Sequence, residues 1–349
     1  MPPALTRRAA LISLGASLGT AVGTTLHPAH ADPKTLEAAA RAEGTLTWYV
    51  AQMDTQTAET FGRAFTAAHP GIRVEVIRVT GQVVLQRLML DIKNRTPHCD
   101  VFSTTDISHM PMLREKGELA PYTPETFADM RPEFKALAEP GWYYPTNAGR
   151  WILIHNRDKV PTGTEPRNWT DLLDPKWKGQ VSVAHPAFSG GAGIWALAMT
   201  QRYGWSFFER LAKNNPRVGR STLDTVTLIS GGECRVGPTF APGAYQALDK
   251  GNPIAITQPS DGVVVMTFPS AVPAHAPHPN AARLFLDWML SEAYGAMLTA
   301  DGSEPIHARV KPRADQPPLD GQTIMAPTVA EIRAGLPDLI ERWRETFGG

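Results

Sequence analysis

Residues 45–79 read TLTWYVAQMDTQTAETFGRAFTAAHPGIRVEVIRV, and this stretch decides the fold class. The apolar run Thr45–Val50 predicts a strand, and the alternation over Ile72–Val79 predicts a second one. Between them, Thr57–Ala68 has helical spacing of its apolar residues and stops at His69, before a proline and a glycine. Strand, helix and strand in this order are the unit of α/β proteins, so we expect an α/β layer with a largely parallel sheet.

The alternation continues along the rest of the chain. A helix is predicted at Val83–Asn94, a strand at Cys99–Thr104, and a helix near His109–Lys116. Trp142–Gly149 interrupts the pattern, because it is aromatic and rich in turn residues. Beyond it, strands are predicted at Trp151–Asn156, Gln180–Ala184, Arg235–Gly237, Ile254–Gln258 and Val263–Phe268, and helices at Trp169–Leu173, Ser189–Tyr203, Trp205–Ala212, Thr222–Ser230, Gly243–Lys250, Asn280–Ser291 and Glu292–Ala300.

The charge balance limits the classes of partner. The chain has 349 residues, with 34 basic and 34 acidic side chains, so no basic excess exists to neutralise nucleic-acid phosphates. No internal run is long and apolar enough to span a bilayer. We expect two α/β lobes, one from residues 32–148 and about 262–305, the other from about 149–261 and 306–349. The cleft between such lobes is the natural place for a small ligand.

The first 31 residues have the features of a secretory signal peptide. Two arginines, Arg7 and Arg8, precede the uncharged stretch Ala9–Leu26, and the small residues Ala29 and Ala31 predict cleavage after Ala31. The adjacent arginines favour the twin-arginine export route, and no lipobox cysteine is present. Cleavage would remove both arginines and no acidic residue, which changes the net charge from 0 to −2. The sequence therefore predicts a protein exported to the periplasm.

Cysteines and histidines give no metal motif. Cys99 and Cys234 lie in apolar, strand-like contexts, where either a disulfide or two free buried thiols would fit. His275 and His278 lie in a proline-rich loop, where histidines are more often solvated than metal-bound. The sequence also lacks the Gly-x-Ser-x-Gly, His-Glu-x-x-His and Walker motifs of common enzyme classes.

The stretch AHPAFSGGAGIW, residues 184–195, is the strongest candidate for a binding site. A predicted strand runs into Ser189, Gly190 and Gly191, and a helix begins there. Helix N-termini carry unpaired amides and partial positive charge, and glycine lets a ligand approach those amides closely, so an anion site is expected. The alternative is an ordinary capping serine followed by glycines that serve packing.

Other candidates follow the same logic. Thr104 and Thr105 follow a strand and precede a helix, and Thr222 opens another helix, although all three could simply belong to capping runs. Arg150 follows a glycine at a predicted crossing between lobes, where it could pair with an anion or be a surface residue. Asp261 lies between two strands and could contact a ligand or form a turn. Hydroxyls, amides and an arginine suit a phosphate, phosphonate or carboxylate.

Several motifs together resemble a known family. They are TLTWYV with TAETFGRAFTAAHPGIRVEVIRVTG, RTPHCDVFSTTD, NWTDLLDPKWKGQVSVAHP, SGGAG, ISGGEC and HPNAARLFLDWMLSEAYGAML, and they run through most of the chain after the signal peptide. They resemble the periplasmic solute-binding proteins of ABC transporters, specifically the ferric-ion-binding branch. The resemblance implies an α/β fold of two lobes, the type II periplasmic-binding-protein fold. Such a protein closes on its ligand about a hinge and delivers it to a membrane permease.

The resemblance does not extend to the metal. Iron-binding members use a histidine, an acidic residue and two adjacent tyrosines, and the matching positions here fall near Gln52 and Met53, at Thr105, and near Pro242 and Gly243. None is a suitable ligand for hard ferric iron, which prefers anionic oxygen donors, so no metal and no cofactor is expected.

What remains of the family pattern is an anion subsite. The resemblance places it at Ser189, Gly190 and Gly191, with Thr222 as a second donor and Arg150 nearby. The aromatic residues Trp142, Tyr143 and Tyr144 would pack on an apolar or sugar portion of the ligand, or in the core of a lobe.

We therefore expect a monomeric periplasmic binding protein without catalytic activity, which binds a small organic anion and feeds an ABC importer. The ligand-binding residues expected from the sequence are Ser189, Gly190, Gly191, Arg150, Thr104, Thr105, Thr222, Asp261, Gln52 and Tyr143. The alternatives are a carrier of ferric iron or an iron chelate, an exported hydrolase, and a sensor that presents its closed form to a membrane receptor.

Overall fold

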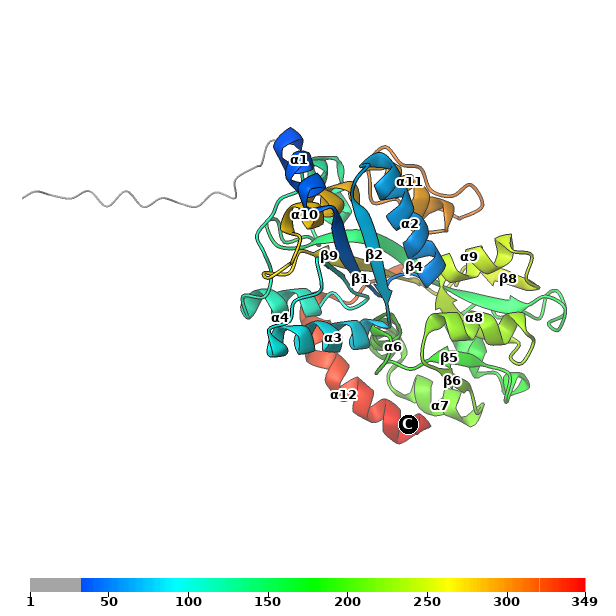
Figure 1. Cartoon of the computed structure of the whole chain (residues 1–349). Coiled ribbons are helices and arrows are strands. Elements are labelled where there is room, and N and C mark those ends of the chain that lie inside the picture. The colour runs from blue at the N-terminus through cyan, green and yellow to red at the C-terminus, as the bar shows by residue number, and fades with distance from the viewer. Residues whose placement is uncertain (1–32, 320, 349) are drawn as a thin grey trace, which may run out of the picture.

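The computed structural model describes residues 33–319 and 321–348, so the predicted signal peptide, residues 1–31, lies outside the described residues. One eight-stranded sheet extends through the molecule, and helices cover both of its faces (Figure 1). The strand order is β2-β1-β3-β9-β4-β7, with β8 also paired to β4 and β10 to β9. These strands are β1 Thr45–Val50, β2 Arg73–Arg78, β3 Val101–Ser103, β4 Tyr144–Asn156, β7 Val236–Phe240, β8 Ile254–Thr257, β9 Val263–Ala271 and β10 Ile324–Met325. A second sheet pairs β5 Ser182–Ala184 with β6 Arg217–Gly219.

The large sheet is mixed, which differs from the largely parallel sheet expected from the sequence. β1 runs parallel to β2 and β3, as the first strand-helix-strand unit predicts. β9 runs antiparallel to β3, and β4 runs antiparallel to β7, β8 and β9. The long strands β4 and β9 pair along most of their lengths and join the two lobes, and their opposite directions account for the mixed pattern.

Twelve α-helices surround the strands within the described residues. They are α1 Pro33–Glu43, α2 Thr55–Ala68, α3 Gly81–Asn94, α4 His109–Glu115, α5 Pro132–Lys135, α6 Gly190–Tyr203, α7 Ser206–Lys213, α8 Thr222–Ser230, α9 Ala241–Asp249, α10 Pro279–Trp288, α11 Glu292–Ala300 and α12 Val329–Phe347. Three short 3-10 helices are η1 Glu125–Asp129, η2 Trp169–Leu173 and η3 Pro175–Trp177. In the part of the chain that the structure describes, no helix combines the length and apolar character needed to cross a bilayer.

Each lobe has an aromatic core. In the first lobe, Trp48 of β1 and Phe285 of α10 meet edge to face with ring centroids 5.2 Å apart. In the second, Trp151 of β4 stacks on Trp195 of α6 at 5.4 Å. These pairs join elements that are distant in sequence, and aromatic pairs of this kind add about 0.5–1.5 kcal/mol to simple burial.

The segment Trp142–Gly149, expected as a turn-rich break, is mostly strand. From Tyr144 onward it is buried and pairs with β9 from Ser270 toward Met266, with an irregularity between Pro145 and Asn147. The proline and glycine misled the sequence interpretation, because strand bulges accept residues that are otherwise typical of turns.

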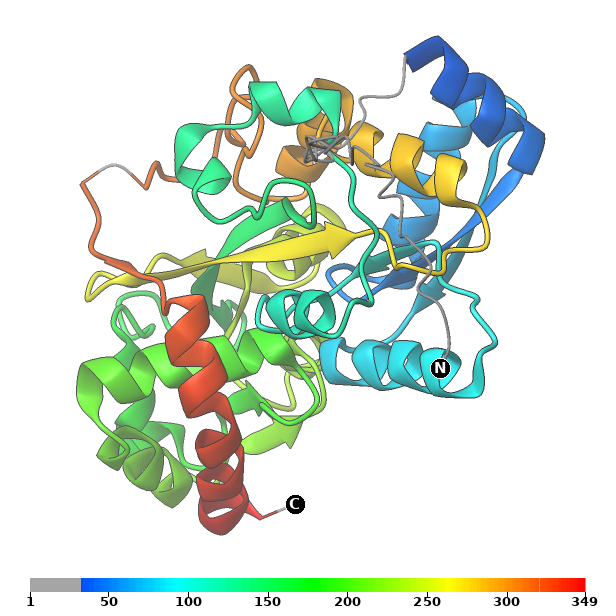
Figure 2. The same cartoon turned by 90° about the vertical axis from the view of Figure 1, so that its left-hand side faces the viewer.

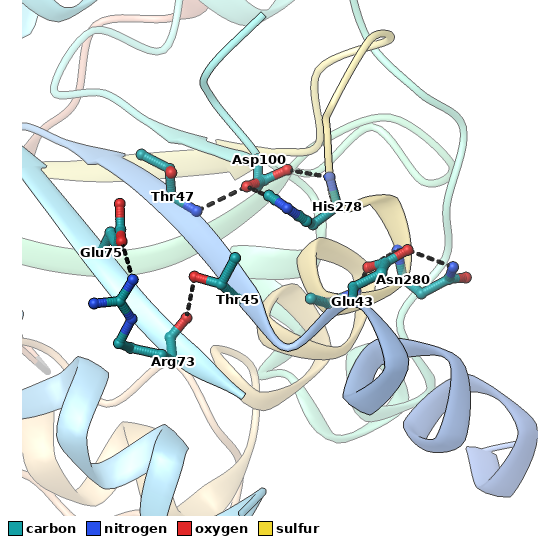
Figure 3. Close-up of polar contacts among 9 residues, drawn as sticks. Glu43, Thr45, Thr47, Arg73, Glu75, Asp100, His278 and Asn280 are labelled. Carbon is teal, nitrogen blue, oxygen red and sulfur yellow. Dashed lines mark hydrogen bonds and ion pairs between the residues drawn. The ribbon is translucent and has the colours of Figure 1, made fainter. Parts of the chain in front are cut away.

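A buried carboxylate anchors the start of α10 to the strands of the first lobe (Figure 3). Asp100 is fully buried and accepts hydrogen bonds from the backbone amides of Thr47 at 2.7 Å and His278 at 2.6 Å. Its second contact with His278 joins Oδ2 to ring Nδ1 at 2.9 Å. On the other side of the helix start, Glu43 accepts from the amides of Asn280 and Ala281. His278 therefore serves the packing of this lobe.

Both cysteines are free and buried. Cys99 lies among apolar side chains of the first lobe, and Cys234 lies among those of the second. Of the two alternatives that the sequence allowed, a disulfide or free buried thiols, the structure has the free thiols. Burial raises the pKa of the Cys99 thiol well above its ordinary value.

Two helices at the ends of the described chain were not predicted. α1 packs on α10, and α12 packs on α6 and α7 (Figure 2). The sequence signal for α12 is the capping box of Thr328 and Glu331.

The boundary between the lobes differs from the expected one near residue 306. Residues 306–349 were all expected in the second lobe, yet Ile306 packs with first-lobe side chains, so the chain changes lobe beyond this residue.

Candidate functional site

A cavity of about 70 Å³ lies where the two lobes meet. Its walls come from Gln52, Arg78 and Thr105 of the first lobe and from Ser189 and Thr222 of the second. Ligand pockets commonly measure about 300–1,000 Å³, so this cavity is small and the lobes lie close together around it.

Five helices begin at this cavity. The lining includes the residue before or at the start of each one: Asp54 for α2, Thr80 and Gly81 for α3, Ser189 for α6, Ser221 and Thr222 for α8, and Phe240 for α9. The first amides of a helix have no acceptor within it, and the aligned peptide dipoles place partial positive charge there. Convergence of these helix starts adds partial positive charge to the cavity wall, which also includes the carboxylates of Asp54 and Asp301.

The serine that opens α6 has the expected position. Ser189 is its N-cap, and its hydroxyl accepts from the amide of Ala192 at a long 3.4 Å. The glycines after it also serve packing, since an added Cβ at Gly190 would lie 2.7 Å from Cβ of Asp106, and one at Gly193 would lie 2.5 Å from Cδ1 of Leu336. The capping and packing alternative therefore accounts for part of this motif, while Ser189 and Gly191 still face the cavity.

Thr105 lies in the first lobe, between the start of α3 and the start of α6 from the second lobe. Its hydroxyl is buried and has no hydrogen-bond partner among the described residues. A Cβ added to Gly81 would lie only 2.2 Å from Oγ1 of Thr105, so only glycine leaves room for this hydroxyl at the start of α3. An unpaired buried hydroxyl is costly, and a ligand oxygen would offer it a partner.

Arg78 is the basic side chain of the cavity among its described lining residues. It ends β2, and its Nε donates to the backbone oxygen of Met53 at 2.9 Å. Burial lowers the pKa of its guanidinium, while the charges of Asp54 and Asp224 act in the opposite direction. The group stays a cation at physiological pH because an arginine pKa starts so high.

Three further buried polar groups face the cavity without partners. They are the side-chain amide of Gln52, Oδ1 of Asn147 and the hydroxyl of Ser303, on residues that are 5%, 2% and 1% exposed. Tyr294 lies beside Gln52 without forming a well-shaped hydrogen bond to it. Buried polar groups in native proteins are nearly always paired, so unpaired ones around one cavity indicate a place for ligand or water.

Two carboxylates form another part of the wall. Asp54 accepts from the amide and hydroxyl of Thr57 at 2.9 and 2.7 Å. Gln246 donates to the same hydroxyl at 3.1 Å and lies against Asp301. Burial raises the pKa of Asp301 above its ordinary value.

Apolar side chains complete the wall. Phe240 and Phe268 meet edge to face at 4.8 Å, and Trp151 lies beside Met266. Phe240 fits because Gly149 has no Cβ, which would lie 2.4 Å from its ring.

Comparison with known proteins identifies the family. The model of the family described as "Bacterial extracellular solute-binding protein" matches residues 97–334, which is more than half of the chain. The chain belongs to this family of bacterial extracellular solute-binding proteins. A Haemophilus influenzae relative described as uncharacterized is 24% identical over 212 residues, which cover 58% of this chain and 61% of that protein. A Salmonella typhimurium protein named "Putative 2-aminoethylphosphonate-binding periplasmic protein" is 24% identical over 322 residues, 87% of this chain and 88% of that protein.

Solved structures of similar fold cover nearly the whole solute-binding protein. The periplasmic binding protein AfuA from Actinobacillus pleuropneumoniae, solved with fructose-6-phosphate, has a TM-score of 0.76 at 19% identity, covering 87% of this chain and 98% of that one. Iron-bound HitA from Pseudomonas aeruginosa has a TM-score of 0.71 at 22% identity, covering 85% and 98%. These likenesses show the two-lobed type II periplasmic-binding-protein fold that the sequence predicted.

The structure of this solute-binding protein brings half of the predicted site residues to the cavity. Gln52, Thr105, Ser189, Gly191 and Thr222 line it. Gly190 lies beside it, where α6 meets Asp106 of the other lobe.

Arg150 does not line the cavity, contrary to the expectation that it would pair with an anion. It is 1% exposed, and its Nε and Nη2 donate to Glu304 at 2.5 and 3.0 Å. Its Nη1 donates to the backbone oxygen of Pro317 at 2.7 Å. The guanidinium thus ties the lobe-crossing strand β4 to the segment after α11.

Three other predicted residues are also engaged elsewhere. Thr104 bonds to Nδ1 of His109 at 2.9 Å, and Asp261 accepts from Tyr203 Oη at 2.6 Å and from the amide of Trp169. Tyr143 is buried in the first lobe, where desolvation raises the pKa of its phenol to about 12. Its neighbours Trp142 and Tyr144 pack in lobe cores as well.

The cavity residues that sequence reasoning missed include Asp54, Arg78, Asn147, Asp301 and Ser303. Arg78 ends an alternating strand, and in the sequence it looks like an ordinary surface residue. Asp54 carries a recognisable signal, because an aspartate three residues before a threonine amide is a typical N-cap. For Asp301 and Ser303, no local pattern exists, since the fold of the whole chain brings the end of α11 to the cleft.

Proposed function

We propose that this solute-binding protein captures a small organic anion in the cleft between its lobes and passes it to an ABC importer in the bacterial envelope. The observation that carries this proposal is the convergence of five helix N-termini on one cavity. Anionic oxygens accept hydrogen bonds from such amides and are stabilised by the helix dipoles.

The side chains around these helix starts support an anion of the phosphate, phosphonate or carboxylate class. Arg78 supplies a positive charge, and the hydroxyls of Thr105, Ser189 and Thr222 supply donors. In this proposal Arg78 has the role that the sequence suggested for Arg150. The relative named for 2-aminoethylphosphonate and the AfuA structure with fructose-6-phosphate belong to proteins of this kind and are consistent with it.

Ferric iron is the less favoured cargo. Tyrosine, histidine and cysteine are absent from the cavity wall as far as the structure describes it, although the similar HitA structure is iron-bound. Two carboxylates, Asp54 and Asp301, are few anionic donors for a hard trivalent ion. An exported hydrolase is also less favoured, since neither histidine nor cysteine is among the described lining residues to complete a Ser-His or Cys-His pair.

The test is a thermal-shift screen of the purified protein, followed by calorimetric titration of each hit. The panel pairs each anion with an uncharged analogue: sugar phosphates with sugars, phosphonates with alcohols, and carboxylates with amides. Ferric citrate is compared with citrate, so that a difference reports the iron. A ligand at one hundred times its dissociation constant adds about 2.7 kcal/mol to the free energy of unfolding. We expect stabilisation by at least one anion and none by its uncharged analogue. Stabilisation by ferric citrate alone, or by uncharged analogues equally, would reject the proposal.

A further inference from the structure

The cavity that the proposed function assigns to an anion also has a negative region, and the following inference rests on that proposed function. Among its described lining residues, Arg78 is balanced by two carboxylates, Asp54 and Asp301. The negative charge of Asp54 acts on Arg78 and raises the pKa of its guanidinium. Asp301 is then left without a compensating cation in the cavity.

No basic side chain of the described residues lies within ion-pair distance of Asp301. The arginine whose charge reaches it, Arg313, is held by Asp249 at 2.6 Å and by Asp315 at 2.6 Å. Asp301 is moreover partly buried near the negative charges of Asp54 and Asp249, and both effects raise its pKa. An ionised carboxylate in such a place is costly unless a cation joins it.

Unpaired buried groups flank both carboxylates. Gln52 lies two residues before Asp54, and Ser303 lies two residues after Asp301. Both line the cavity, and neither Oε1 of Gln52 nor the hydroxyl of Ser303 has a hydrogen-bond partner in the described part of the chain. Two carboxylates and these two oxygens offer acceptors to a group with several N–H donors. A protonated amine has three such donors and a positive charge.

The acidic group of residues is distinct from the helix-start group. Asp54, Thr57, Gln246 and Asp301 are joined to one another by the contacts described above, at the start of α2, on α9 and after α11. Gly81, Thr105 and Gly190 meet at the starts of α3 and α6. A ligand that reached both groups would have charges of opposite sign on different parts of the molecule.

We propose that the ligand of this protein is a zwitterion, whose protonated amino group is received by Asp54 and Asp301 while its anionic group faces the helix starts. The carboxylate of Asp301 determines the preference for the amine. Gln52 and Ser303 accept hydrogen bonds from the same ammonium group. The ligand class is thereby narrowed from organic anions to amino-substituted ones.

The experiment compares matched ligands by calorimetric titration of the purified protein. One pair is ethylphosphonate and 2-aminoethylphosphonate, and the other is propionate and 3-aminopropanoate. Within each pair the anionic group is the same, so any difference reports the amine. We expect the aminated member of at least one pair to bind at least about tenfold tighter, a difference of about 1.4 kcal/mol.

The Asp301→Asn variant then locates the preference. It should reduce the advantage of the amine to less than about twofold, while the plain anion should bind as tightly or more tightly, because a negative charge is removed from the cavity. Asp249→Asn is the matched control, because Asp249 is near in space but paired with Arg313 and does not line the cavity. The unliganded Asp301→Asn protein should melt at the same or a higher temperature, since it loses an uncompensated carboxylate, and this verifies that the variant folds.

The outcomes separate the two proposals. If both members of each pair bind with equal affinity, the zwitterion proposal is rejected and the proposal of anion binding stands. The same holds if Asp301→Asn weakens binding of both members equally. If neither these pairs nor any anion of the wider panel stabilises the protein, the proposed function fails and this inference fails with it.

Discussion

Two adjacent threonines, Thr104 and Thr105, differ in whether their hydroxyls form hydrogen bonds within the protein. The hydroxyl of Thr104 bonds to His109 and accepts from the amide of Asp106 at 3.2 Å. The hydroxyl of Thr105 is buried at the cavity with no partner in the described protein. Both were singled out in the sequence for one reason, their position between a strand and a helix. Nothing local distinguishes them, because the difference depends on which side of the loop meets α6 of the other lobe.

Replacement of each threonine by valine should therefore have opposite effects. Thr105→Val removes no internal hydrogen bond, so the free energy of unfolding should stay the same or rise. Its affinity for the anion should fall by about 1.5–3 kcal/mol, the range for a hydrogen bond to a charged group. Thr104→Val should lower the free energy of unfolding by about 1–3 kcal/mol, because His109 and the Asp106 amide lose a partner.

Urea unfolding and calorimetric titration measure the two quantities separately. If Thr105→Val lost stability as Thr104→Val does, while keeping its affinity, its hydroxyl would have no role in binding.

Helices and strands were the best-predicted level of the structure. α8, α11 and η2 have the predicted bounds, and α6 begins after its predicted cap, Ser189. Caps and apolar spacing are local features, so the sequence displays them directly. The direction of β4 and β9 and the identity of the cavity residues after α11 depend on contacts between distant segments. No short stretch of sequence contains that information.

The pair of Arg150 and Glu304 fixes one element to another at the junction of the lobes. Both side chains are buried, and Gln316 also donates to Glu304 at 2.6 Å. Replacement of Arg150 by methionine would leave Glu304 charged and buried, so the free energy of unfolding should fall by about 3–5 kcal/mol. The double variant Arg150→Met, Glu304→Gln should recover much of this loss, because no buried charge is then left unpaired.

Urea denaturation of the three proteins provides the measurement. An unchanged midpoint in Arg150→Met would contradict this role of the ion pair in stability.

At the scale of the whole molecule, close approach of the lobes depends on Gly190. A Cβ there would lie 2.7 Å from Cβ of Asp106 and 3.1 Å from its backbone nitrogen, and neither atom is the end of a flexible side chain. Gly190→Ala should therefore hold the lobes apart. We expect the affinity for ligand to fall about tenfold or more, equivalent to about 1.4 kcal/mol, and the radius of gyration with saturating ligand to increase in small-angle scattering.

Gly191→Ala is the matched control for the scattering measurement. Its added Cβ would meet Sδ of Met266 at 3.4 Å, an ordinary contact. An unchanged radius of gyration and affinity in Gly190→Ala would show that the lobes close without this contact.

The stability of the molecule should depend on pH through four histidines. Burial lowers the pKa of His109, His155, His185 and His307 below the ordinary value of 6.5. Their contribution to stability is present above pH 6.5 and is lost as the pH falls through their folded pKa values, because the unfolded chain binds the protons first. Asp301 has the opposite effect on stability. Its pKa is raised in the folded protein, so protonation of its carboxyl at low pH favours the folded state.

We therefore expect the free energy of unfolding to fall between neutral pH and about pH 5, measured by urea denaturation. His109→Gln should make this dependence less steep, because it removes one of the histidines whose pKa is lowered by burial. A flat profile across this range would contradict the assignment of neutral histidines.

The five helix starts have a consequence for how the two halves of the molecule meet. α2 and α3 belong to one half, and α6, α8 and α9 to the other, so poles of the same sign face one another across the interface. Like poles repel, and water must screen them whenever nothing negative stands between them. In the proposed function, the anionic group of the solute would be the counterion of these helix starts, so that binding of the solute would itself favour closure of the lobes.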